Sequence, residues 1–272
     1  MVGREGEERS VKQFAPEYSR NDNGWIIFPS DVEYRAQIFP TEVNKHPAKA
    51  NLWLVQEIIK YVSSPDETVM DIMAGSGTIL VGLLLGRRVT CIEISQKFFY
   101  LLERALANIE LIAPGSSNNA MLVNAPCQTV LPVPADHIIF SPPYAQIMKS
   151  KGKDKLTVEK TDYDMAEYTQ DPLNVGQVNE FFYHHMMEGI YKKCYESLPV
   201  GGSLSIIIKD HMKDRKRVEL SDRARRDCEK IGFVLQDWYK WPAPGSVYSH
   251  IYKARGWETC EDEDILILRR IK

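Results

Sequence analysis

ETVMDIMAGSGTILVGLLLGRRVTCIEIS, residues 67–95, is the stretch that decides the fold class of this chain of 272 residues. It begins with an apolar run of strand length at 68–73 and continues through the glycine-containing turn 74–77. An apolar run of helix length follows at 78–86, and a second strand-like run at 87–94. A strand, a tight turn, a helix and another strand in direct succession are typical of a parallel β-α-β unit.

The same alternation extends in both directions from this unit. Residues 50–62 have apolar side chains at helical spacing. Further helices are expected at 96–112, 178–198 and 219–232, and further strands at 120–125, 136–141, 203–208, 233–241 and 264–271. We therefore expect an α/β fold with a mostly parallel sheet and helices on both faces.

Three segments interrupt the alternation. Residues 1–43 have no clear periodicity and are interpreted as an N-terminal leader or arm, which leaves 44–272 as one α/β domain. The apolar anchors of the leader are Phe14, Trp25, Ile26, Ile27 and Phe28. The connections 145–180 and 242–258 are longer than most loops of compact domains, and such loops usually have a function or are disordered.

Composition and charge argue against several classes of protein. No apolar run approaches the ~20 residues that cross a bilayer, and the polar start does not have the pattern of a secretory signal. The net charge of −3 neither favours nor excludes a nucleic-acid partner. Five cysteines without a CxxC pair predict neither a zinc site nor a disulfide framework. We therefore expect a cytoplasmic protein without a metal.

The turn at 74–77 has the composition of a nucleoside-binding loop. Gly75 and Gly77 permit a tight turn and let a ligand approach the backbone. Leu80 stands where a dinucleotide fingerprint has its third glycine, and the phosphate-binding lysine is absent, so a nucleoside is favoured over a pyrophosphate. Glu93, at the end of the next strand, can accept hydrogen bonds from both ribose hydroxyls. The alternative is a structural turn with Glu93 capping a helix.

Residues 136–148, DHIIFSPPYAQIM, end a predicted strand with a stiff turn. Pro142 and Pro143 remove two backbone donors and fix two φ angles, so the strand stops abruptly. Such a turn is either a plain surface feature or a rigid surface that grips a flat group.

Four motifs together resemble the amino-methylating DNA methyltransferases, which methylate exocyclic nitrogens of cytosine or adenine. They are NKHPAKANLWL (44–54), DIMAGSGT (71–78), CIEIS (91–95) and IIFSPPY (138–144). The likeness covers most of 44–272, with the cofactor half before the catalytic half. It implies a Rossmann-like methyltransferase fold, with a mostly parallel seven-stranded sheet whose last strand is antiparallel. It also implies S-adenosylmethionine as cofactor and double-stranded DNA with a flipped base as substrate.

The resemblance further implies roles for individual residues. The catalytic tetrapeptide would be Ser141, Pro142, Pro143 and Tyr144. The cofactor would be contacted by His46, Pro47, Lys49, Asp71, Met73, Ala74, Gly75, Ser76, Gly77, Thr78, Glu93, Ile94, Asn124 and Ser141.

Two positions depart from the family pattern. After Asp71 the family usually has Pro-Phe or Pro-Cys, whereas this chain has Ile72 and Met73. A thioether fills irregular gaps, so Met73 can still pack against the cofactor. The third predicted strand ends in Asn124 where the family usually has an aspartate for the adenine amine. An amide can accept that hydrogen bond, but less strongly than a carboxylate.

The tetrapeptide suits methyl transfer to an exocyclic amine, whose lone pair is delocalised into the ring. Ser141 Oγ and the carbonyl of Pro142 can accept both N–H groups and so direct the lone pair, while the prolines fix this geometry. Tyr144 offers a face for stacking of the base, which must first leave the duplex. No cysteine nucleophile is required, because the methyl donor is already activated by its positive sulfur.

Several alternatives remain open. By the family pattern, serine at position 141 favours N4 of cytosine over N6 of adenine. RNA could be the substrate of the same fold. Enzymes that methylate protein glutamine share Pro-Pro-Tyr but generally have asparagine in the first position. A catalytically silent nucleic-acid-binding module is the non-enzyme alternative, and Met73 and Asn124 keep it open.

Basic residues are concentrated in two segments. Lys149, Lys151, Lys153 and Lys155 follow the tetrapeptide directly, and we expect them to contact the phosphates of nucleic acid. Residues 209–226 carry eight Lys or Arg against four acids, but for 218–226 a solvated helix face is at least as good an interpretation. The acidic run 261–264 is expected on a loop. Sequence selectivity would come from the long loops, from the leader or from a second subunit in a homodimer.

Overall fold

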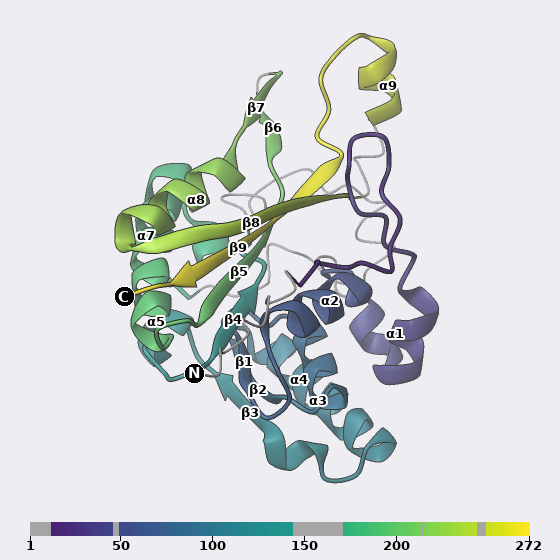
Figure 1. Cartoon of the computed structure of the whole chain (residues 1–272), viewed down its shortest axis with the longest axis vertical. Coiled ribbons are helices and arrows are strands. Elements are labelled where there is room, and N and C mark those ends of the chain that lie inside the picture. The colour runs from purple at the N-terminus through teal and green to yellow at the C-terminus, as the bar shows by residue number, and fades with distance from the viewer. Residues whose placement is uncertain (1–11, 46–48, 144–170, 214, 244–248) are drawn as a thin grey trace, which may run out of the picture.

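The core of the protein is a seven-stranded sheet in the order β3-β2-β1-β4-β5-β9-β8 (Figure 1). The computed structural model describes residues 12–45, 49–143, 171–213, 215–243 and 249–272. In sheet order the strands are Ala120–Asn124, Arg88–Glu93, Thr68–Asp71, His137–Phe140, Ser203–Ile208, Asp262–Arg270 and Phe233–Pro242. Strands β1 to β5 pair in parallel, and β9 is antiparallel to both β5 and β8. The expected mostly parallel sheet with an antiparallel last strand is therefore confirmed.

Helices cover both faces of the sheet, as the alternation of strands and helices predicts. On one face pack α1 (Val32–Ile38), α2 (Leu52–Val62), α3 (Val81–Leu84) and α4 (Gln96–Ile112). On the other face pack α5 (Cys127–Val130), α7 (Glu180–Ser197) and α8 (Leu220–Ile231). The remaining elements are η1 (Thr41–Lys45), η2 (Thr78–Leu80), η3 (Ser116–Asn119), η6 (Val175–Gln177), α9 (Ser249–Ala254), β6 (His211–Lys213) and β7 (Lys216–Val218).

Successive side chains of the central strands enter two different apolar layers. Ile139 of β4 joins the layer under α2 and α4, whereas Ile138 and Phe140 join the layer under α7 and α8. All four residues of β4 are buried. A parallel strand covered on both faces has no solvent side, which explains why residues 138–140 are apolar in succession rather than in alternation.

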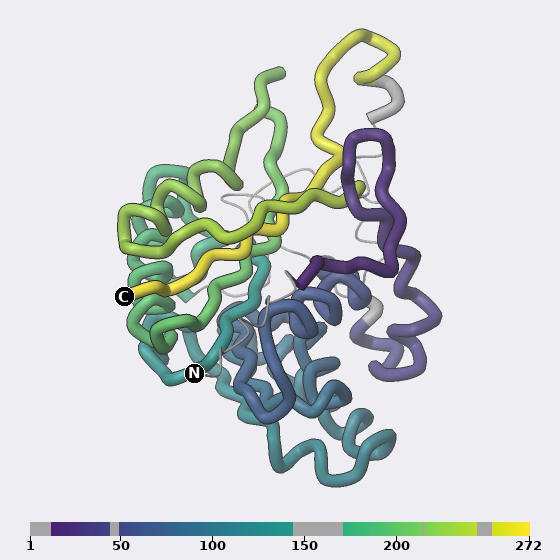
Figure 2. Tube along the Cα trace, in the orientation of Figure 1, coloured from purple at the N-terminus to yellow at the C-terminus, as the bar shows by residue number. Residues whose placement is uncertain are grey.

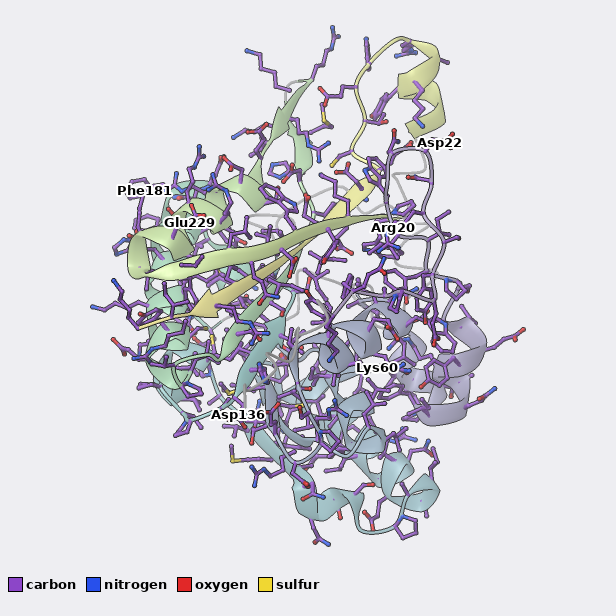
Figure 3. The ribbon with its side chains drawn as sticks, viewed as in Figure 1. Arg20, Asp22, Lys60, Asp136, Phe181 and Glu229 are labelled. Atoms are coloured by element: carbon purple, nitrogen blue, oxygen red, sulfur yellow. The ribbon has the colours of Figure 1, made fainter. Side chains whose placement is uncertain are left out.

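The strand order reverses at β1. The chain continues from β1 through β2 and β3 on one side, and β4 and β5 lie on the other. Open α/β sheets bind ligands outside the carboxyl ends of the strands at such a point. At the opposite, amino end, Asp136 Oδ2 accepts a hydrogen bond from Thr68 N–H at 2.8 Å and joins β1 to β4. Figure 3 labels Asp136 at that end, and Arg20 and Asp22 of the leader toward the other.

The leader packs onto the sheet. Phe14 stacks on Tyr239 of β8 with ring centroids 4.7 Å apart, and Ile26 N–H donates to the carbonyl of Lys240 at 2.9 Å. Figure 2 shows the leader alongside the carboxyl end of β8. Of the expected anchors, Phe14, Ile26 and Phe28 are buried, whereas Ile27 is 43% exposed. The division of the chain at residue 43 stays a prediction.

Two local predictions differ from the structure. The acidic run 261–264 is not a loop, because its last three residues begin β9. Asp262 and Asp264 are buried there, and ion pairs with Arg217 and Lys240 offset their charges. The hairpin of β6 and β7 was not expected, because its strands have neither apolar alternation nor a glycine turn.

Candidate active site

The predicted motifs meet at the carboxyl ends of three neighbouring strands. The glycine turn 74–77 follows β1, Glu93 ends β2, and Ser141 follows β4. β1 and β4 are adjacent and parallel, with Val69 opposite His137. The structure thus places the glycine turn and the start of the Ser-Pro-Pro segment on adjacent strand ends, at the point where strand order reverses.

Glu93 holds the glycine turn against the end of β2. One carboxylate oxygen, Oε2, accepts the N–H of Gly75 at 2.7 Å, and Oε1 accepts the N–H of Ser95 at 2.7 Å. The Glu93 residue is 1% exposed. A carboxylate oxygen has two lone pairs and can accept more than one donor. Glu93 can therefore fix the turn and also accept hydroxyl groups of a ligand.

Gly77 is required by the shape of the turn. Its φ is +82°, and a Cβ at this position would lie 2.6 Å from Leu102 Cδ2 of α4. Residues other than glycine rarely adopt this left-handed backbone conformation. Ser76 and Thr78 on either side are buried, so α4 and the turn pack closely.

Asp71 stands beside Glu93 and is partly buried. Its Oδ1 accepts the N–H of Met73 at 2.9 Å, which orients the side chain at the start of the turn. Burial raises the pKa of Asp71 to about 7, the hydrogen bond from Met73 opposes this rise, and the nearby Glu93 carboxylate adds to it. Two carboxylates close together at low exposure favour a positively charged ligand.

The leader reaches this turn through Arg35, a contact that was not expected. Arg35 of α1 is 1% exposed, and its Nη1 donates to Thr78 Oγ1 at 3.1 Å. Its Nη2 pairs with Asp31 Oδ2 at 2.6 Å and donates to the carbonyl of Ala50 at 2.7 Å. The available signal was the Asp31–Arg35 spacing of i and i+4, which is typical of a helical ion pair. Burial, followed by the charge of Arg35, lowers the pKa of Lys49, which also lies in this region.

Asn124 is exposed at the end of β3, next to β2. Its Nδ2 donates to the main-chain carbonyl of Glu93 at 2.8 Å. This contact fixes the amide so that Oδ1 is the atom available to accept a hydrogen bond from a ligand. The geometry is compatible with the adenine contact that the resemblance implies, which stays a prediction.

The structure describes only part of the predicted site. Pro142 is buried, and Ser141 and Pro143 are partly exposed. Of the residues predicted to contact the cofactor, the structure describes Lys49, Asp71, Met73, Ala74, Gly75, Ser76, Gly77, Thr78, Glu93, Ile94, Asn124 and Ser141. His46, Pro47, Tyr144, Lys149, Lys151, Lys153 and Lys155 lie outside the described residues.

No thiol near this edge is suited to nucleophilic attack among the described cysteines. Cys91 of β2 pairs with Asp71 across the strands and is buried. Burial, and then the charges of Asp71 and Glu93, raise the pKa of Cys91. A thiol with a raised pKa is a poor nucleophile because the thiolate is the reactive form.

Two kinds of feature are absent from the described residues. In the described part of the chain, no helix combines the length and apolarity that a bilayer span needs. Within the same residues, no three His, Cys, Asp or Glu side chains cluster in a way that could hold a metal ion.

A known family model matches the first part of the chain. The model of a DNA methylase family, comprising N6 and N4 methyltransferases, matches residues 5–104. The matched segment runs from the leader through the glycine turn and Glu93 into α4, and it ends before Ser141. No curated protein matches the chain.

Solved structures share the fold at low sequence identity. TrmN from Thermus thermophilus superposes with a TM-score of 0.50 and 16% identity, over 84% of this chain and 52% of TrmN. This chain thus spans about half of the length of TrmN. Precorrin 8W decarboxylase from Methanobacterium thermoautotrophicum gives a TM-score of 0.48 and 13% identity, over 83% of this chain and 94% of that one.

A third similar structure is a complex with S-adenosylmethionine. The glycopeptide N-methyltransferase MtfA complexed with S-adenosylmethionine gives a TM-score of 0.45 and 14% identity, over 79% of this chain and 92% of that one. Residues 5–104 thus match the model of the DNA methylase family, and the described residues share the fold of TrmN.

Proposed function

We propose that this protein is a DNA methyltransferase that transfers a methyl group to the exocyclic amine of a flipped base in double-stranded DNA, at N4 of cytosine. The observation that carries the proposal is the placement of the glycine turn and Ser141 on adjacent strand ends, β1 and β4, where strand order reverses. A cofactor held on the first and an amine held on the second would lie next to each other. The proposal places this activity in the cytoplasm, on cellular DNA.

The residues at the end of β1 and β2 fit S-adenosylmethionine. When bound, this cofactor supplies a methyl group on a positively charged sulfur. Asp71 and Glu93 can match its positive charge and its two ribose hydroxyls, because both carboxyl groups lie at the ends of these adjacent strands. The glycine turn is held in one shape by close packing, because a Cβ at Gly77 would lie 2.6 Å from Leu102 Cδ2.

Ser141 and Pro142 would position the acceptor amine. In the proposed arrangement Ser141 Oγ and the Pro142 carbonyl each accept one amine N–H. This holds the nitrogen lone pair toward the sulfonium methyl group. Pro142 is buried, which supports a fixed rather than an adaptable turn. The proton leaves to water once the new N–C bond has formed. Tyr144 would stack on the base, which stabilises by about 1–3 kcal/mol.

Substrate choice is tested by giving tritiated S-adenosylmethionine with duplex DNA, RNA and protein in parallel. The labelled product is then digested to nucleosides or amino acids. We expect label in N4-methylcytosine from duplex DNA. Label only in N6-methyladenine would change the base, and label only in RNA would change the substrate. If the protein binds S-adenosylhomocysteine but none of the three substrates is labelled, the proposed enzyme activity is contradicted.

A further inference from the structure

Two arms leave the carboxyl end of the sheet on the side of β5, β9 and β8 (Figure 1). The hairpin arm consists of β6 (His211–Lys213), Arg215 and β7 (Lys216–Val218), and it lies between β5 and α8 in the chain. The α9 arm, residues 249–261, connects β8 to β9. β5 and β9 are neighbours, with Ile208 opposite Asp264, so the two arms begin next to each other.

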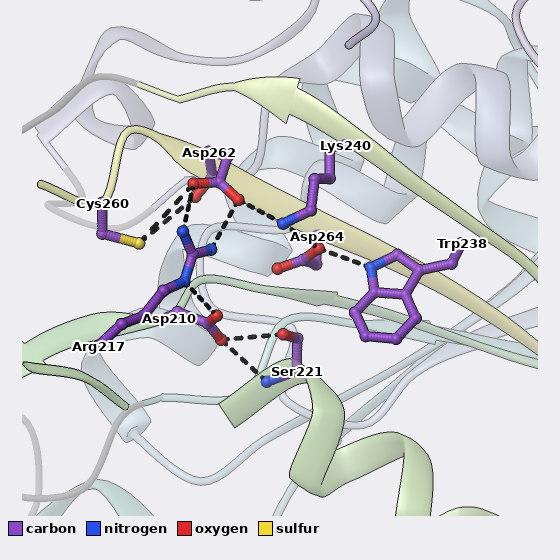
Figure 4. Close-up of polar contacts among 8 residues, drawn as sticks. All are labelled: Asp210, Arg217, Ser221, Trp238, Lys240, Cys260, Asp262 and Asp264. Carbon is purple, nitrogen blue, oxygen red and sulfur yellow. Dashed lines mark hydrogen bonds and ion pairs between the residues drawn. The ribbon is translucent and has the colours of Figure 1, made fainter. Parts of the chain in front are cut away.

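The bases of the arms are joined by a buried ionic cluster (Figure 4). Arg217 of the hairpin arm donates from Nε to Asp210 Oδ2 at 2.8 Å and from Nη2 to Asp262 Oδ2 at 2.7 Å. Lys240 of β8 pairs with Asp262 and lies 2.8 Å from Asp264 Oδ1. Burial works against ionisation of Asp262, but hydrogen bonds from Arg217 and Lys240 outweigh it and lower its pKa to about 2.

The tips of the arms are joined by a different contact. The guanidinium of Arg215 lies 4.3 Å from the ring centroid of Trp257 in the α9 arm. Arg255 of the same arm lies 5.3 Å from that centroid. Cations within about 6 Å of an indole are attracted to its π face. The arms are therefore connected at the base by buried ion pairs and at the tip by an indole that contacts two guanidinium groups.

Positive charge accumulates at these tips. Arg215, Lys216 and Arg255 are exposed, whereas the exposed Lys253 is paired with Glu261. Two guanidinium groups near one indole repel each other, and a polyanion that contacts both would offset this repulsion. The spacing of cations along two arms is also suited to successive phosphates. By contrast, the arginines of α8 at 223, 225 and 226 are neutralised by helical ion pairs with acids on the same helix.

We propose that the hairpin arm and the α9 arm form a clamp for the phosphate backbone of duplex DNA, and this inference rests on the proposed function. Both arms rise from the end of the sheet at which Ser141 follows β4, and β4 is the neighbour of β5. DNA held by Arg215 and Arg255 would thus lie along the edge of the sheet at which Ser141 would bind the flipped base. The clamp does not read sequence, because phosphate contacts position the duplex without identifying bases.

The test measures binding of a labelled random-sequence duplex by fluorescence anisotropy at several salt concentrations, with S-adenosylhomocysteine present. The variant Arg215→Gln/Arg255→Gln is compared with Arg225→Gln/Arg226→Gln, which removes the same charge from paired arginines of α8. Each lost phosphate contact lowers the slope of log K against log salt by about 0.9, which gives about 60-fold weaker binding at 0.1 M salt for two contacts. The control variant should bind as the wild type does.

A second variant separates charge from geometry. Trp257→Ala keeps both arginines but removes the contact that joins the tips. We therefore expect weaker DNA binding, with a smaller change in salt slope than in Arg215→Gln/Arg255→Gln. Trp257→Phe should restore the DNA affinity. If Arg215→Gln/Arg255→Gln keeps the wild-type affinity and slope, the clamp is refuted while DNA binding by the protein stands. If the wild type binds RNA and not the duplex, DNA is the wrong occupant. Absence of duplex binding by the wild type would contradict both the clamp and the proposed function.

Discussion

Gly77→Ala is the most direct perturbation of the glycine turn. Gly77 has φ +82°, and a Cβ there would lie 2.6 Å from Leu102 Cδ2 and 3.0 Å from Leu80 Cδ1. A left-handed alanine costs about 1–2 kcal/mol, and the forced repacking about 1–3 kcal/mol more. We therefore expect a loss of about 2–5 kcal/mol in the free energy of unfolding. For a chain of this size that lowers the melting temperature by about 4–10 °C.

Gly115→Ala is the matched control for this prediction. Gly115 also has a left-handed φ, +91°, but no atom lies within 4 Å of a Cβ built there. Its substitution should cost only the backbone term, about 1–2 kcal/mol, or roughly 2–4 °C. Melting is followed by circular dichroism, and binding of S-adenosylhomocysteine by calorimetry. Gly77→Ala should also weaken this binding, whereas Gly115→Ala should not. Equal melting temperatures and equal affinities for the two variants would refute the reasoning.

Two further predictions concern side chains around the same turn. The pKa of Asp71 is raised to about 7 from an ordinary value of 3.8. Between these two pH values the folded protein retains a proton that the unfolded chain has lost. The free energy of unfolding should therefore decrease as pH rises from 3.8 to about 7. Ligand affinity should increase over the same window as Asp71 ionises, and Asp71→Asn should flatten both profiles; unaltered profiles would remove Asp71 from the site. Arg35→Met removes the cation that is paired with Asp31 and should cost about 3 kcal/mol in a denaturant titration, whereas Arg104→Ala, which removes an exposed ion pair, should cost less than about 1 kcal/mol. A similar cost for both variants would contradict the assigned role of Arg35.

The order of strands and helices was predictable because burial determines apolar periodicity directly. β4 and β5 are buried on both faces, and each ends in three consecutive apolar residues. The helix expected at 96–112 was found at those residues. The glycine turn was recognisable because Gly75 and Gly77 meet a backbone requirement that few other residues satisfy. These features depend on local sequence, so the sequence alone was enough to identify them.

Features that depend on distant partners could not be predicted in the same way. Asp262 and Asp264 looked like loop residues because buried carboxylates are rare without cations. Their partner Arg217 is 45 residues from Asp262, and no local pattern shows that the two meet. Arg35 was missed for the same reason, since its contact with Thr78 spans 43 residues. The helix expected at 78–86 is replaced by η2 and one turn of α3, because the chain leaves the helix at Leu85 and turns at Gly86 with φ +75°.

The variant Ser141→Ala tests most directly whether β4 presents the acceptor beside the cofactor. Methyl transfer to duplex DNA and binding of S-adenosylhomocysteine are measured in the same preparation. Loss of one hydrogen bond to the reacting amine should lower the turnover rate by about 100-fold or more, as loss of a preorganised polar contact does in other enzymes. The affinity for the cofactor product should stay within about twofold, since Glu93 and the glycine turn are untouched. A variant that turns over as fast as the wild type would contradict the account.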